Sequence, residues 1–217
     1  MDEDIYRKKL AFVIVFAMAA AFVEAAVVVY LRALYYPEGF GFPLKLVPMD
    51  IFLVEVVREV ATVGMLLAVA ALAGKRRWER FGYFLILFGV WDILYYVCLK
   101  AAINWPSSLL DWDILFLVPL PWIGPVIAPV TVAVVMIAIG LLITRRFARG
   151  HGFRPTGLAW FASGVGTFVL LYSFMRDTDA TLRFQMPQPY QYVLLGTGVS
   201  LYAIAFIESY AKSRRDG

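Results

Sequence analysis

Residues 10–34 read LAFVIVFAMAAAFVEAAVVVYLRAL, an apolar run of 25 residues that follows the basic residues Arg7, Lys8 and Lys9. A helix needs about 20 apolar residues to cross the hydrocarbon core of a bilayer, whereas the apolar region of a signal peptide has only about 7–15. We therefore interpret this run as an uncleaved first transmembrane helix.

Five more apolar stretches follow the first one, and the whole chain has the composition of a membrane protein. Of its 217 residues, 62% are hydrophobic and 17% are charged, whereas a soluble domain is about 45–50% apolar and about 25% charged. The pattern predicts an all-α, polytopic integral membrane protein, a six-transmembrane-helix bundle that forms one domain over residues 1–217. The predicted spans are residues 10–34, 51–72, 81–103, 114–144, 158–175 and 192–210.

The fourth stretch is longer than one span requires, and its first half reads ILFLVPLPWIGPVIAP over residues 114–129. Each proline removes a backbone donor and clashes with the preceding helical turn. We expect a proline-broken span, with residues 114–122 kinked or re-entrant and a regular helix from about Gly124. Non-helical backbone persists at membrane depth only inside protein or beside a polar cavity, so the break suggests a cavity next to it.

The basic residues alternate between the two ends of the predicted spans. Fourteen of the twenty Lys and Arg residues lie in the N-terminal segment, the second and fourth loops and the C-terminal segment. Cytoplasmic loops carry this excess of positive charge, so we expect a cell (inner) membrane protein with both termini cytoplasmic. The net charge of +4 is not arranged as a basic stripe on a soluble surface, and we expect the lipid bilayer rather than nucleic acid as its partner.

Cysteine and histidine are nearly absent from the sequence, which contains only Cys98 and His151. One residue of each kind excludes an intrachain disulfide, a CxxC site and a metal centre built from several histidines in one chain. We expect no metal site, and the sequence does not identify a cofactor.

Charged residues inside the predicted spans are the strongest functional signal. Glu24 lies near the middle of the first span, and Glu55, Arg58 and Glu59 are spaced i, i+3 and i+4 in the second. These three therefore share one helix face. A charge at the bilayer centre costs about 3 kcal/mol on insertion scales, so this face should turn into the bundle.

The third span carries a second polar face, formed by Asp92, Tyr95, Tyr96 and Lys100. We expect the two faces to meet, with Arg58 and Lys100 neutralising the surrounding acids. Asp113 and two tryptophans lie near this level of the predicted bundle. The candidate ligand-binding residues are Glu24, Glu55, Arg58, Glu59, Trp91, Asp92, Tyr95, Tyr96, Lys100, Asp113 and Trp122.

Three functional hypotheses are compatible with these residues, besides an ion-pair network that only fixes helix register. The first is an outward-facing pocket that binds or transports a small polar solute or ion, or holds a lipid headgroup. In architecture, though in no motif, such a chain resembles the substrate-binding membrane subunits of vitamin-uptake transporters. The second is an intramembrane enzyme on a lipid or lipid-linked substrate, with Asp92 and Glu59 as acid and base. The third is an accessory subunit of a larger membrane complex.

Two further expectations concern packing and access. Small residues gather in AMAAAFVEAA of the first span, SGVGTF of the fifth and LGTGVS of the sixth. Such faces are typical of close helix packing, within the chain or in a homo- or hetero-oligomer. The loop over residues 176–191 is long enough to fold over the pocket as a lid.

Overall fold

The computed structural model describes residues 3–45 and 47–215, and its six long helices are each long and apolar enough to cross a membrane. This confirms the predicted number and apolar character of the helices. Two short strands and one short helix complete the fold. The elements are α1 (Glu3–Tyr35), α2 (Met49–Ala73), α3 (Arg77–Ile103), β1 (Trp112–Phe116), β2 (Trp122–Pro125), α4 (Ile127–Ala148), α5 (Gly157–Met175), α6 (Thr178–Leu182) and α7 (Tyr192–Arg215).

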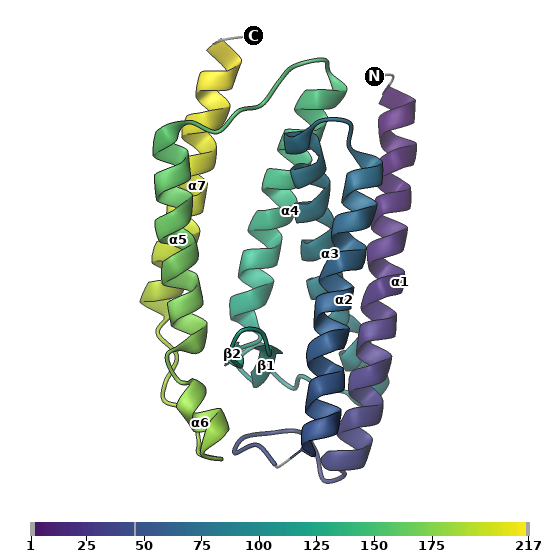
Figure 1. The fold of residues 1–217 in the computed structure, drawn as a ribbon, viewed down its shortest axis with the longest axis vertical. Coiled ribbons are helices and arrows are strands. Elements are labelled where there is room, and N and C mark those ends of the chain that lie inside the picture. Colours follow the sequence, from purple (N-terminus) through teal and green to yellow (C-terminus); the bar gives the residue numbers. More distant parts are fainter. Residues whose placement is uncertain (1–2, 46, 216–217) are drawn as a thin grey trace.

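The long helices run side by side in two groups (Figure 1). Helix α3 packs against α1, α2 and α4, while α5 and α7 pack mainly against each other. Both ends of the described chain lie at the same end of the molecule, and the two strands and α6 lie toward the opposite end (Figure 1). The fold therefore has a four-helix group, a two-helix group and a small non-helical cap between them.

The proline-rich segment is neither a kinked helix nor part of the fourth long helix. It forms an antiparallel hairpin of β1 and β2, in which Asp113 lies opposite Gly124, with an irregularity between Ile114 and Phe116. Helix α4 begins only at Ile127. Prolines cannot donate to a helical hydrogen-bond ladder, whereas strand pairing provides partners for the other backbone groups of this apolar segment. In place of the expected kinked or re-entrant segment and a helix from about Gly124, the structure has two paired strands and a helix from Ile127.

Helices α3 and α4 approach each other through glycines. A Cβ atom added to Gly140 would lie 2.5 Å from the carbonyl oxygen of Gly82, and one added to Gly89 would lie 2.6 Å from that of Ala133. No carbon side chain fits at such distances. The close contact of α3 with α4 therefore depends on these small residues.

The other small-residue segments also pack within the chain. Ala17 and Ala21 of α1 are fully buried in a core cluster that includes Leu66 of α2. Gly166 of α5 and Gly198 of α7 face each other, so that a Cβ on either would lie 3.2 Å from the other's carbonyl oxygen. An oligomer interface on the remaining surface of these helices stays a prediction.

We predict that Gly140→Ala lowers the melting temperature of the detergent-purified protein, because overpacking a filled contact costs about 1–3 kcal/mol. The matched control is Gly164→Ala in α5, where no atom lies within 4 Å of an added Cβ. That change should be neutral or stabilising, since alanine favours helix over glycine by up to about 1 kcal/mol. Equal melting temperatures for wild type and Gly140→Ala would contradict the close packing of α3 against α4.

Candidate functional site

A cavity of about 190 Å³ lies between α1, α2, α3 and the hairpin. Nine of the eleven sequence-predicted residues line it, and they come from four elements that are far apart in the chain. Helix spacing explains why α2 and α3 each contribute more than one of them, because residues three or four positions apart share a face. The nine residues are Glu24, Glu55, Arg58, Glu59, Trp91, Asp92, Tyr95, Tyr96 and Asp113.

Arg58 stands at the centre of an ion-pair network that joins α1 to α2. Its Nη1 donates to Glu24 Oε1, and its Nε and Nη2 donate to Glu55 Oε2 at 2.9 Å and 2.6 Å. Thr62 donates to the second oxygen of Glu24 at 3.2 Å. Arg58 thus neutralises two acids. The sequence analysis predicted this role for Arg58 and for Lys100.

The second ion pair was missed by the sequence analysis. Arg32 Nη2 donates to Asp113 Oδ1 at 3.0 Å, and both side chains are more than nine-tenths buried. The Arg32 guanidinium carbon lies 3.7 Å from the ring centre of Trp105 and 4.1 Å from that of Phe40, which gives it two cation–π contacts. The position of Arg32 in the last turn of a transmembrane helix indicated that it needs a partner. The sequence could not identify that partner, because Asp113 lies 81 positions away.

Burial raises the pKa of Asp113 from 3.8 to about 6, although the charge of Arg32 and the hydroxyl of Tyr96 act to lower it. Asp113 is therefore ionised at neutral pH and pairs with Arg32 as a carboxylate. In mildly acidic solution the same carboxyl takes up a proton, so the pair is sensitive to pH in that range.

The hairpin forms one wall of the cavity. The backbone N–H of Leu117 donates to Glu59 Oε2 at 2.8 Å, and residues 114–117 line the cavity. The proline-rich segment was expected to have a cavity next to it, and its residues 114–117 line this one as part of the hairpin and its turn. The expected lid over residues 176–191 does not line this cavity; there, Thr178 donates instead to the carbonyl oxygen of Pro121 at 2.9 Å.

Two of the predicted residues lie elsewhere. Lys100 is exposed, and its Nζ donates to the carbonyl oxygens of Pro106 at 2.9 Å and Asn104 at 3.4 Å. Lys100 follows Asp92 by eight positions, which is more than two helical turns of 3.6 residues each. Its side chain therefore points away from the helix face that Asp92 occupies. Trp122 stacks on Phe174, with ring centres 6.2 Å apart, and lines a separate apolar groove.

Segments that the prediction left out complete the cavity wall. Tyr36 and Phe40 follow α1, and Val47 precedes α2. These residues belong to the connection between α1 and α2, which lies at the end of the molecule away from the termini (Figure 1).

Several buried polar atoms around the cavity have no hydrogen-bond partner in the described part of the chain. They are Arg32 Nε and Nη1, Trp91 Nε1, Asp92 Oδ2 and Asp113 Oδ2, and all four residues line the cavity. An unsatisfied buried polar group costs about 1–3 kcal/mol, and native proteins rarely leave several together. Donors and acceptors that converge on one cavity are what a polar ligand requires.

We predict that the stability contributed by the Asp113 carboxyl is largest at low pH. Because its folded-state pKa is raised, the folded chain keeps a proton that the unfolded chain loses between pH 3.8 and about 6. The melting temperature of wild type minus that of Asp113→Asn should therefore fall as the pH rises from about 4 to about 7.5. A difference that grows over this range would show that the folded state favours the ionised carboxyl.

Comparison of the chain with known protein families, with curated proteins and with solved structures found no match.

Proposed function

We propose that this chain is a multi-pass protein of the cell (inner) membrane whose cavity binds a small polar solute with a positively charged group and moves it across the membrane. The observation that carries this proposal is the set of unpartnered donors and acceptors on the cavity wall. A purely structural ion-pair network would leave few such atoms, because its groups would satisfy one another.

The surface of the helices supports a position in the bilayer. Phe12 is 75% exposed, Phe168 71% and Leu72 88%, and they lie on three different long helices. A water-soluble monomer rarely exposes large contiguous apolar areas. Hydrocarbon chains of lipid are the natural neighbours of such side chains.

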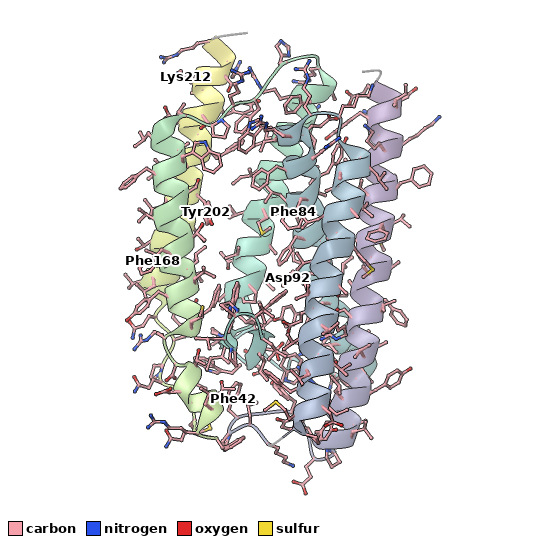
Figure 2. All side chains as sticks on the ribbon, viewed as in Figure 1. Phe42, Phe84, Asp92, Phe168, Tyr202 and Lys212 are labelled. Atoms are coloured by element: carbon pink, nitrogen blue, oxygen red, sulfur yellow. The ribbon has the colours of Figure 1, made fainter. Side chains whose placement is uncertain are left out.

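The distribution of charge supports an orientation with both termini in the cytoplasm. Lys212 lies at the end of the molecule that holds the termini, Phe42 lies at the opposite end, and Asp92 lies between them (Figure 2). The basic second and fourth loops lie at the end with Lys212 (Figure 1). The positive-inside rule then directs the charged cavity toward the outer half of the membrane.

The balance of charge on the cavity wall favours a ligand with a cationic group. Five carboxylates and two guanidinium groups line the cavity. Arg58 and Arg32 pair with three of the acids, while Asp92 and Glu59 form no ion pair within the described residues. An ammonium group beside Asp92 would supply the missing charge, and the ring of Trp91 offers it a cation–π contact.

The remaining donors favour a ligand that also carries an acceptor. The free N–H groups of Arg32 and Trp91 can each donate to a carboxylate or hydroxyl of the bound molecule. The cavity of about 190 Å³ is smaller than the roughly 300–1,000 Å³ of pockets for drug-sized ligands. A compact zwitterion or amine of amino-acid size fits both the charge and the volume. Non-helical backbone beside such a site is also a feature of transporters.

We predict opposite accessibility for two engineered cysteines in a Cys98→Ala background. Ser108→Cys should react with a membrane-impermeant maleimide on intact cells, because the loop after α3 is expected outside. Lys212→Cys should react only after the cells are permeabilised. Labelling of Lys212→Cys on intact cells would overturn the orientation, and both native side chains are exposed, so burial does not confuse the result.

We predict that a small zwitterion or amine raises the melting temperature of the purified protein through linkage, and that Asp92→Asn abolishes this shift. The screen compares amino acids, polyamines and quaternary amines with anionic and neutral solutes. The matched control is Asp50→Asn, an exposed acid of the first turn of α2 that does not line the cavity. This control should keep the full shift.

The ligand found in that screen is then tested for uptake into proteoliposomes. Uptake that requires Asp92 and not Asp50 supports transport. A shift without uptake would reduce the proposal to binding, and the absence of any shift, with Asp92→Asn melting lower than wild type, would favour a structural network.

A further inference from the structure

A second, larger groove separates the two helix groups. It has a volume of about 590 Å³ and is lined mainly by apolar side chains of α3, α4, α5 and α7. Phe84 of α3 and Tyr202 of α7 line it from opposite sides, and both are labelled in Figure 2. Its volume lies within the roughly 300–1,000 Å³ of ligand pockets, and its lining suits a hydrocarbon chain.

A basic pocket of about 640 Å³ lies at the end of the molecule with the termini. Arg76 and Arg77 reach it from the start of α3, Arg146 from the end of α4 and Arg154 from the following loop. Among the described residues, no acidic side chain lines this pocket. None of the four arginines forms an ion pair within that part of the chain, so no described side chain neutralises their positive charge.

Arg146 shows that this pocket is built rather than a chance gathering of surface charges. Its side chain is only 8% exposed, and its Nε donates to the carbonyl oxygen of Gly152 at 2.5 Å. Its Nη2 donates to the carbonyl oxygen of Ser213, and the guanidinium lies 5.6 Å from the ring centre of Tyr210. These neutral partners hold the guanidinium in place but leave its charge uncompensated, which is costly for a buried cation.

The apolar groove and the basic pocket adjoin each other. Trp78, Phe153, Pro155 and Trp160 line both of them. The ring of Trp78 lies 5.7 Å from that of Trp160 and 6.3 Å from that of Phe153, in edge-to-face contacts. Tryptophan favours the headgroup level of a bilayer, so this aromatic group marks the boundary between the apolar and the charged part.

We propose that the groove and the pocket together form one site that binds an anionic phospholipid, with its phosphate among the four arginines and an acyl chain in the apolar groove. Arginine donates to phosphate oxygens in a bidentate manner. A zwitterionic headgroup also carries a cation, which the arginines would repel, whereas an anionic headgroup carries none. In the proposed orientation the arginines face the cytoplasmic leaflet, where anionic lipids are enriched. The site is distinct from the acidic cavity and does not depend on the solute bound there.

The test measures lipid retained by the detergent-purified chain with native mass spectrometry. The probes are dioleoyl phosphatidylglycerol and dioleoyl phosphatidylcholine, which share acyl chains and differ in headgroup charge. We expect one phosphatidylglycerol to be retained at least tenfold more than phosphatidylcholine. Excess inorganic phosphate should not displace it, because free phosphate lacks the acyl chain.

Two triple variants of equal charge test the arginines. Arg76→Gln, Arg77→Gln and Arg154→Gln together should remove the preference for phosphatidylglycerol. Arg149→Gln, Arg214→Gln and Arg215→Gln remove the same charge from exposed positions outside the pocket and should keep the preference. Equal loss in both triple variants would show a general charge effect and overturn the proposal.

Two tryptophan variants test the groove. Val135→Trp fills the groove that Val135 lines and should reduce retention of both lipids at least tenfold. Val134→Trp lies next to it in α4, at a position 53% exposed and outside the groove, and should retain lipid like wild type. Retention unchanged by Val135→Trp, or a lipid-free dimer that occupies this face in wild type, would also overturn the proposal. Melting curves confirm that each variant is folded.

Discussion

The charge of Arg58 is the constraint around which the cavity is organised. It donates to Glu24 on α1 and to Glu55 on its own helix, and the three charged groups are only partly exposed. A buried ion is tolerated only when it is paired and hydrogen-bonded. Because Arg58 engages Glu24 and Glu55, the unpaired acids Asp92 and Glu59 remain on the cavity wall. The ion pair thereby fixes the contact between α1 and α2, and it leaves Asp92 and Glu59 available to a ligand.

The two sites of the molecule have opposite chemistry and lie toward opposite ends. Acids outnumber bases on the wall of the small cavity, while the pocket near the termini is lined by four arginines and by no acid of the described residues 3–45 and 47–215. The chain has a net charge of only +4, so this polarity arises from placement rather than composition. A bilayer has the same kind of asymmetry, since its cytoplasmic leaflet carries the anionic lipids. The proposed solute site and lipid site therefore fit one orientation.

Local periodicity was sufficient to predict the helices and much of the cavity, whereas the partner of Arg32 and the hairpin were not predictable from it. Glu55, Arg58 and Glu59 share a face because of their spacing alone, and the structure places all three on the cavity wall. The partner of Arg32 lies 81 positions away, so only the packed fold reveals it. The hairpin was missed because four prolines in an apolar run indicate where a helix breaks, but not which structure replaces it.

The hairpin connects the two helix groups, and this gives it a part in both proposed sites. Leu117 donates to Glu59 and Asp113 pairs with Arg32 on the cavity side. Trp122 lines the apolar groove and stacks on Phe174 of α5 on the other side. The hairpin thus places residues 114–117 on the wall of the acidic cavity and Trp122 on the wall of the apolar groove. Because the two strands are paired, one small element fixes the contacts with α2 on one side and with α5 on the other.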